Sequence, residues 1–302
     1  MPNTTLRPVG WCAALALCGL LLASCRTSPP VSNQPSLTRI AVVSDVHVNS
    51  RPKDDERLYP GRLDLVIQAV NAAKVDLVLM PGDLTEHGTA EEFAAFRKQI
   101  QKFRAPVWLV PGNHDVGGKP IKGNKDAVTL ERVKTFEAGC GPSYFVREQS
   151  GVRVVGLTAS LLGSDFPLET KQWDFLEKQL AVPSPKPTLL LLHYPPYQKS
   201  PDEGSGDYFD LEPQPRARLL ALARQGGVKA ILTGHLHHPL TNHLDNIVLL
   251  SAPSIAVGLP KGKVPEAWFL LSVSKDQFTW DLKTIPVLAL PKSTNGPTSA
   301  PK

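Results

Sequence analysis

Residues 75–83 read "VDLVLMPGD", a short apolar run that ends in Pro-Gly-Asp. An apolar run of this length, bounded by turn residues, is typical of a buried strand. Segments with helical spacing lie on either side, "RLDLVIQAVNAA" (62–73) before it and "TAEEFAAFRKQIQKF" (89–103) after it. Each borders a further apolar run, "RIAVVSD" (39–45) and "PVWLVPGNHD" (106–115). This β-α-β-α-β order predicts parallel strands joined by right-handed crossovers.

The rest of the chain has a mixed pattern. "SYFVREQSGVRVVGLTA" (143–159) predicts an antiparallel hairpin. The segments expected next are a helix at 169–180, a strand at 188–196, a helix at 214–227, a strand at 228–235 and three apolar runs, typical of antiparallel β, up to residue 285. Without an internal repeat or a linker, we expect one domain over residues 38–287, an α/β fold with two packed sheets and helices outside.

The two ends of the chain differ from this domain. Residues 1–25 have a positive start and an apolar stretch too short for a comfortable membrane span, and they end in "LASC", which resembles a bacterial lipobox. We expect a lipoprotein-type signal peptide and a protein exported to the bacterial cell envelope, anchored to a membrane through lipidated Cys25. An ordinary signal peptide or an uncleaved anchor is the alternative. Residues 26–37 are a Pro/Ser-rich tether, and residues 288–302 are a polar tail that we expect to be disordered.

Composition limits the function only broadly. The 302 residues are 42% apolar and 20% charged, as in a globular protein, and the net charge of +5 slightly favours anionic ligands. No basic stripe or aromatic platform indicates nucleic-acid binding. Once the signal peptide is removed and Cys25 carries lipid, Cys140 is the remaining cysteine, which excludes a disulfide within the mature chain.

Polar side chains recur where the predicted strands end. Ligands of open α/β folds bind beyond the carboxyl ends of the strands, and five of the eight histidines follow such ends. The polar residues at these ends are Asp45, His47, Asp83, Asn113, His114, Asp115, His193, His235 and His237. Carboxylate and imidazole donors suit iron, manganese, zinc or nickel. The alternative is that these residues only cap helices or complete turns.

Seven of these residues are too many ligands for one ion and suit two divalent ions, with Asp83 shared because it stands alone at its strand end. The candidate ligands are Asp45, His47, Asp83, Asn113, His193, His235 and His237. Two such ions could acidify a bridging water and hold both oxygens of an in-line displacement. His238 is left out of the set, because residues two apart in an extended segment point the same way and neighbours do not.

The motifs "SDVH", "PGD", "PGNHD", "LLHYP" and "TGHLH" occur in this order over residues 38–285. Together they resemble the signature of the calcineurin-like metallophosphoesterases. The resemblance implies a four-layer α/β/β/α sandwich with two mixed sheets. It implies a first metal held by Asp45, His47, Asp83 and His237 and a second held by Asp83, Asn113, His193 and His235. It also implies that His114 protonates the leaving oxygen or steadies the transition state, with Asp115 paired to it. The alternatives are a structural His114 and an Asp115 that caps the next segment.

Two branches of this family compete for the substrate. "GDLTEHGTAEEF" (82–93) resembles the cyclic-nucleotide phosphodiesterases, whereas "DEGSGDYFDL" (202–211) resembles the calcineurin-like phosphoesterase domain-containing phosphatases. We expect attack by a metal-bridging hydroxide on a small phosphoester or a phosphoprotein, with a preference for monoesters. A cyclic-nucleotide-type diesterase is the alternative, and a non-catalytic envelope lipoprotein is a further one. The extra cation usual in monoesterases is not identifiable in the sequence. The sequence also does not indicate the oligomeric state.

Overall fold

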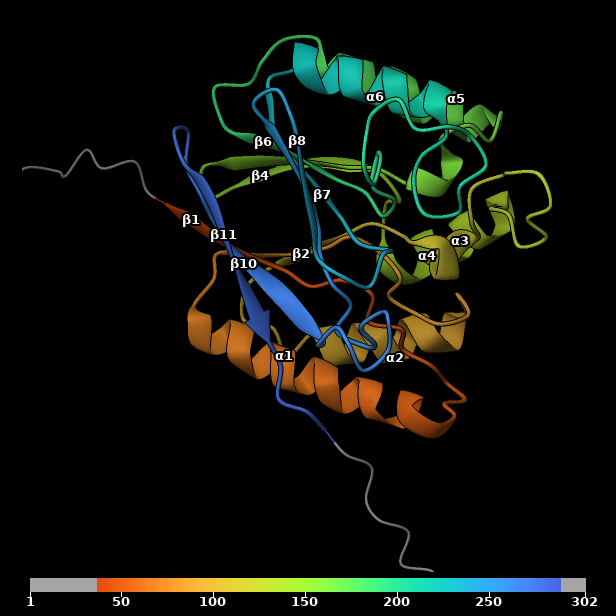
Figure 1. Ribbon diagram of the computed structural model, residues 1–302. Helices are drawn as coiled ribbons and strands as arrows, with labels where there is room; N and C mark the ends of the chain where they lie inside the picture. The colour runs from red at the N-terminus through yellow and green to blue at the C-terminus, as the bar shows by residue number, and fades with distance from the viewer. Residues whose placement is uncertain (1–36, 289–302) are drawn as a thin grey trace, which may run out of the picture. The chain divides into compact units, whose positions relative to one another are not determined.

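The computed structural model of the protein describes residues 37–288 (Figure 1). The predicted signal peptide, the tether up to residue 36 and the tail from residue 289 lie outside these residues and stay predictions. Cys140 lies inside the described part and is a buried free thiol. Within residues 37–288, no helix combines the length and the apolar character needed to span a membrane.

The first sheet contains the β-α-β-α-β segment. Three of its strands, β1 (Thr38–Val42), β2 (Leu77–Met80) and β3 (Val107–Leu109), are parallel, as predicted. Two strands from the C-terminal part of the domain complete this sheet. Strand β10 (Ala267–Val273) pairs antiparallel with β1, and β11 (Phe278–Thr284) pairs antiparallel with β10. The strand order is therefore β11-β10-β1-β2-β3, which makes this a mixed sheet.

The second sheet has six strands in the order β4-β5-β6-β7-β9-β8. Its four inner strands are parallel to one another, and each of its two edge strands is antiparallel to the inner strand beside it. The bounds are β4 Phe145–Gln149, β5 Val152–Gly156, β6 Thr188–Leu191, β7 Val228–Thr233, β8 Leu240–Leu244 and β9 Ile247–Ser251. The predicted hairpin at residues 143–159 is confirmed as β4 and β5.

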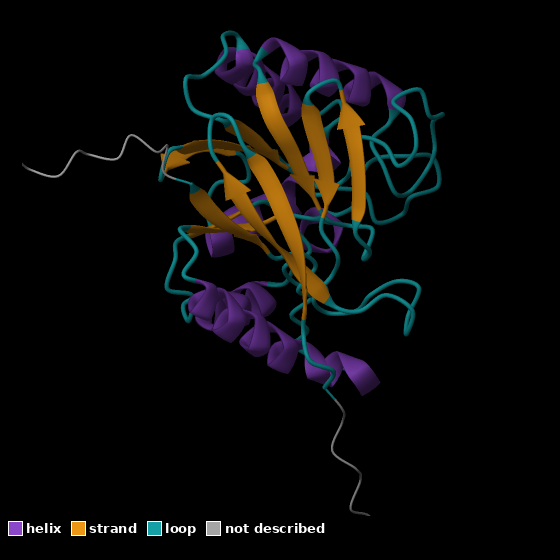
Figure 2. Cartoon of the chain, turned by 60° about the vertical axis from the view of Figure 1, so that its left-hand side comes forward, coloured by secondary structure: helices purple, strands orange, loops and turns teal. Residues whose placement is uncertain are grey.

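Helices cover the outer face of each sheet (Figures 1 and 2). Helices α1 (Tyr59–Ala73), α2 (Ala90–Ile100) and α4 (Leu130–Cys140) share a core with the first sheet. Helices α5 (Pro167–Leu180) and α6 (Pro213–Gln225) share a core with the second. Three shorter helical segments are η1 Asp54–Leu58, α3 Asn113–Val116 and η2 Ala159–Leu161. The predicted four-layer α/β/β/α sandwich is confirmed.

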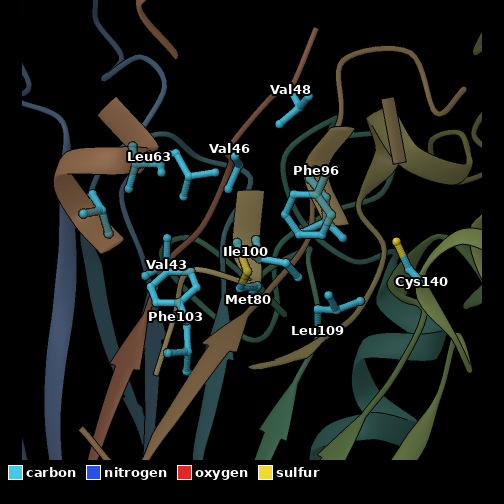
Figure 3. Packing of buried hydrophobic residues seen from close by; sticks show 14 of the residues in the cluster. Val43, Val46, Val48, Leu63, Met80, Phe96, Ile100, Phe103, Leu109 and Cys140 are labelled. Atoms are coloured by element: carbon cyan, nitrogen blue, oxygen red, sulfur yellow. The ribbon is translucent and has the colours of Figure 1, made fainter. Parts of the chain in front are cut away.

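Strand β2 shows why the apolar runs are continuous. Leu77 and Leu79 belong to the core between the two sheets, whereas Val78 and Met80 belong to the core under the helices. Side chains of a strand alternate between its two faces, so a strand buried on both faces must be apolar throughout. Figure 3 shows Met80 on the helix side, packed with residues that include Ile100.

Two elements differ from the sequence-based expectation. Helix α4 was not predicted, although Thr129 caps its first turn by accepting a hydrogen bond from the Arg132 N–H, and its buried residues have helical spacing. Strand β9 was expected to be antiparallel to its neighbours, but it is parallel to β7. The unpredicted edge strand β8 explains this, because it reverses the chain once before β9 reverses it again.

Candidate metal centre

All the predicted ligands lie just after the carboxyl ends of five parallel strands, β1, β2, β3, β6 and β7. Two groups of potential ligands share Asp83. The first group is Asp45, His47, Asp83 and His237, and the second is Asp83, His193 and His235. Within each group the ligand atoms lie within 4.8 Å of one another. The structure thus brings the residues together in the predicted pattern, while their role as ligands stays a prediction.

The first group surrounds a point between its two carboxylates. The Nε2 atom of His237 lies 3.3 Å from Oδ1 of Asp45. The Nε2 atom of His47 lies 3.2 Å from Nε2 of His237 and 3.8 Å from Oδ2 of Asp83. Two carboxylate oxygens and two imidazole nitrogens therefore face one another, which is a donor set suited to a borderline divalent metal.

The second group adds the predicted amide ligand. The Nε2 atom of His193 lies 3.2 Å from Oδ2 of Asp83 and 3.0 Å from Oδ1 of Asn113. It also lies 3.2 Å from Nδ1 of His235. Asn113 thus lies beside the second group, as the family resemblance implies, and its oxygen faces the same point as the histidine nitrogens.

Hydrogen bonds fix the histidine rings in an orientation suited to metal binding. The Nδ1 atoms of His47, His193 and His237 lie 2.8–2.9 Å from oxygens of Glu86, Pro81 and Val257. In each ring this leaves Nε2 facing the centre. Metal-ligating histidines in proteins characteristically donate their other N–H to a carboxylate or a carbonyl in this way.

His235 has the opposite orientation. Its Nδ1 atom faces the centre, whereas its buried Nε2 atom has no hydrogen-bond partner among residues 37–288. The ring packs against the rings of Tyr194 and Tyr208, at centroid distances of 4.3 and 4.9 Å. These aromatic neighbours fill the space behind the ring, and Nδ1 is the nitrogen that remains available.

The backbone at these positions is strained. Ten non-glycine residues in the described part have positive φ, and five of them are predicted ligands. These five are Asp45, His47, Asp83, His235 and His237. A non-glycine residue in this conformation costs about 1–3 kcal/mol and is found preferentially at functional sites. The loops therefore hold unfavourable conformations that turn the ligand side chains inward.

Two motif glycines allow the ligand loops to approach one another. A Cβ atom on Gly112 would lie 2.1 Å from Oδ1 of Asp83 and 2.3 Å from the Asp83 backbone nitrogen. A Cβ atom on Gly234 would lie 2.6 Å from Oδ2 of Asp45. The glycines of "PGN" and "TGH" are thus required by close packing against the two carboxylates.

The electrostatics of the centre favour added positive charge. Asp45 and Asp83 are 0% and 1% exposed. Burial alone would raise the pKa of Asp83. The charge and the hydrogen bond of His193 oppose burial and bring the pKa well below its usual value. Burial lowers the pKa of His193, but Asp83 raises it to about 9. Two buried carboxylates thus draw protons onto neighbouring histidines, and the same need for positive charge fits divalent cations.

His114 lies at the edge of the centre and faces a pocket. Its backbone N–H donates to Oδ1 of Asp83 at 2.9 Å, and its side chain is about one third exposed. The ring Nδ1 lies 2.9 Å from the carbonyl oxygen of Glu86 and 3.6 Å from a carboxylate oxygen of the same residue. Burial lowers the pKa of His114, but Asp83 and Glu86 raise it above its usual value. The ring is therefore held by Nδ1, and within the described part of the chain Nε2 makes no hydrogen bond.

The predicted pairing of Asp115 with His114 is wrong. Both oxygens of the fully buried Asp115 accept hydrogen bonds from the backbone N–H groups of Leu84, Thr85 and Gly112 at 2.8–3.1 Å. The Thr85 hydroxyl donates a further one at 2.8 Å. Asp115 thus joins the Asp83 loop to the Asn113 loop and caps α3, the helix that contains it, whereas the alternative interpretation was a cap on the next segment.

Glu86 replaces Asp115 as the carboxylate partner of His114. It also accepts from Nδ1 of the predicted ligand His47, at 2.9 Å. The sequence analysis missed this residue, although it follows Asp83 by three positions within "GDLTEHG". Its position on the Asp83 loop was the available signal. His238 hydrogen-bonds through Nδ1 to the carbonyl oxygen of Leu236 at 2.9 Å and belongs to neither group.

A pocket of about 560 Å³ opens beside His114 and Asn113. Its wall includes Arg132 and Tyr208, neither of which the sequence analysis singled out. The Arg132 guanidinium donates to Oδ1 of Asp126 at 2.6 Å and to the His114 carbonyl at 3.1 Å. The pocket is the natural position for the part of a substrate that extends beyond the centre.

Comparisons with known proteins agree with this geometry. Residues 38–239 match the family model described as calcineurin-like phosphoesterase. The chain is 28% identical to a probable glycerophosphodiester phosphodiesterase GpdQ of Arcobacter nitrofigilis, over 77% of this chain and 84% of that one. It is 26% identical to the human serine/threonine-protein phosphatase CPPED1, over 66% of this chain and 62% of that one. A dimetal phosphatase of Danio rerio has the same fold, with a TM-score of 0.55 at 13% identity over 83% and 96% of the two chains.

Proposed function

The chain belongs to the calcineurin-like phosphoesterase family, and we propose that it hydrolyses phosphodiesters at a centre of two divalent cations. As a member of this family it is a metal-dependent hydrolase acting on phosphoric ester bonds. The relatives named above include a diesterase and a phosphatase that acts on proteins, so family membership alone leaves the class of ester open.

The proposed ligand sets follow the two groups of the centre. The first cation would be held by Asp45, His47, Asp83 and His237, and the second by Asp83, Asn113, His193 and His235. Manganese, iron, zinc and nickel all suit these oxygen and nitrogen donors. When bound, such a pair of cations supplies an acidified water and polarises the phosphoryl oxygens. Asp83 is proposed as the shared ligand because both groups include it.

His114 is proposed to protonate the leaving oxygen. Its Nδ1 is engaged with the Glu86 carbonyl, and its partly exposed ring lines the pocket beside the centre. A proton donor at this position can reach an oxygen that leaves toward the pocket. Glu86 would keep the ring in this orientation, because its carbonyl and its carboxylate both lie next to Nδ1.

The charge of the pocket wall is the reason for proposing a diester rather than a monoester. The wall contains two carboxylates, Glu86 and Asp126, and Arg132 is its one lysine or arginine side chain. Arg132 is already paired with Asp126. A phosphomonoester near neutral pH carries close to two negative charges, whereas a diester carries one. Among residues 37–288, the pocket wall therefore offers no lysine or arginine, other than the one paired with Asp126, to balance the second charge of a monoester. This supports the diester and reverses the preference drawn from the sequence.

The test compares bis-p-nitrophenyl phosphate with p-nitrophenyl phosphate on protein loaded with manganese, iron, zinc or nickel. We expect kcat/KM for the diester to exceed that for the monoester by about 10-fold, which corresponds to about 1.4 kcal/mol. A higher kcat/KM for the monoester would overturn the choice of diester. Activity on neither ester, with two metals per chain confirmed by elemental analysis, would overturn catalysis and favour the binding lipoprotein.

The place of action is proposed from the sequence alone. "LASC" (22–25) supports lipidation at Cys25, export to the bacterial cell envelope and attachment to a membrane. Residues 26–36 would then separate the catalytic domain from the membrane surface. Mass spectrometry of protein isolated from cells tests this, with a lipidated N-terminal Cys25 expected. An unmodified Cys25 on a chain that keeps Met1 would contradict it.

A further inference from the structure

Tyr208 reaches the second ligand group from the segment 202–211, called here the insertion. Its hydroxyl accepts a hydrogen bond from Nδ2 of Asn113 at 3.2 Å, and its ring lies 4.9 Å from the His235 ring, centroid to centroid. Asn113 and His235 both belong to the proposed second cation site. Tyr208 also lines the pocket beside His114 and is 46% exposed. A single side chain from the insertion therefore contacts two members of the second site.

The Asn113 amide needs a fixed orientation. Only its Oδ1 atom can bind a cation, because the Nδ2 atom has two N–H bonds and no free lone pair directed outward. Rotation by half a turn about the last side-chain bond would present Nδ2 to the centre. The Tyr208 hydroxyl accepts a hydrogen bond from Nδ2 in the observed orientation and restrains that end of the amide against movement. Oδ1 then stays directed toward Nε2 of His193, at 3.0 Å.

Two buried, positively charged side chains, Arg216 and Lys119, hold the insertion in place. The Arg216 side chain is 1% exposed and donates to the backbone carbonyls of Glu203 and Leu211 at 2.7 Å and to Oδ1 of Asp210 at 3.0 Å. The Lys119 ammonium, from the loop after α3, contacts the Asp210 carbonyl and Oε1 of Glu212. Both ends of the insertion are therefore tied to the domain, which holds the Tyr208 hydroxyl at a defined position.

We propose that Tyr208 is a positioning residue for the second cation, acting through Asn113. This inference rests on the metal centre of the proposed function and identifies the insertion as a part of it. Groups that orient a metal ligand in this way typically change metal affinity or activity by about 10- to 100-fold when removed. The hydroxyl contributes the orientation, and the ring contributes packing against His235.

The test measures binding of Mn²⁺ alone to metal-free protein by isothermal titration calorimetry. Tyr208→Phe removes the hydroxyl and keeps the ring. The matched control is Tyr197→Phe, which removes a hydroxyl that donates to the His243 carbonyl at 3.1 Å, away from the ligands. We expect Tyr208→Phe to weaken one of two Mn²⁺ sites by about 10-fold or more and to leave the other unchanged. Tyr197→Phe should leave both unchanged.

Turnover provides a second readout. In Tyr208→Phe, the Mn²⁺ concentration at half-maximal rate should rise about 10-fold, whereas in Tyr197→Phe it should stay close to that of the original protein. Unchanged affinity at both sites, or an equal loss at both, would overturn the inference. Wild-type protein that binds two Mn²⁺ ions but hydrolyses no ester would overturn the proposed function, and the affinity comparison would still decide the role of Tyr208. Wild-type protein that binds no Mn²⁺ would overturn both.

Discussion

Replacement of Gly112 by alanine tests whether close approach of two loops builds the centre. The added Cβ would lie 2.3 Å from the Asp83 backbone nitrogen and 2.1 Å from its Oδ1. Non-bonded carbon atoms keep about 3.5 Å from other heavy atoms, so the loops must separate by about 1 Å. Rotation of the Asp83 side chain cannot relieve the contact with the backbone. The overpacking should cost about 1–3 kcal/mol of unfolding free energy.

The larger effect should be on the metals. Metal–ligand distances tolerate about 0.2 Å, and a displacement of 1 Å at a reacting centre can cost about 100-fold in rate. Because Asp83 is shared by both groups, we expect Gly112→Ala to lower metal content at both sites and kcat/KM by at least about 100-fold. Gly204→Ala is the matched control, since its Cβ would have no neighbour within 4 Å. Elemental analysis, thermal unfolding and diester kinetics on both variants give the answer. A Gly112→Ala protein with two metals and nearly full activity would refute the reasoning.

Four further substitutions test the roles assigned to His114 and to the residues near it. His114→Ala removes the proposed proton donor, so it should keep both metals in elemental analysis and lower turnover by about 100-fold or more. His238→Ala should change neither metal content nor turnover. Loss of metal in His114→Ala would make His114 a ligand. Glu86→Gln removes a negative charge that raises the pKa of His114, so the alkaline decline of kcat/KM should move to lower pH, and an unmoved pH profile would contradict the assigned contact. Asp115→Asn places an NH₂ group against buried N–H donors and should lower the unfolding free energy by about 1–3 kcal/mol in denaturant titrations; an unchanged stability would count against the capping role.

The sequence was sufficient for the framework of the site. Apolar runs ending in Asp45, Asp83 and His193 show where parallel strands stop, and the carboxyl ends of such strands meet at one edge of a sheet. Because strand position and residue type are both local properties of the chain, the seven candidate donors could be predicted from them. Their division into two groups was implied by the resemblance to the calcineurin-like metallophosphoesterases. Helix α4 was not predicted, although its N-cap Thr129 is a local signal in the sequence.

The contacts that finish the site depended on the tertiary structure. The partner of His114 is Glu86, not the adjacent Asp115, because the Asp83 loop brings Glu86 next to the His114 ring, whereas the Asp115 carboxylate accepts hydrogen bonds from three backbone N–H groups. Tyr208 and Asn113 are 95 residues apart, and the packing of Arg216 under the insertion brings them together. Loop conformation and distant packing leave no periodic trace in a single sequence. The sequence therefore determined which groups can bind metal, and the folded chain decided which groups hold them in place.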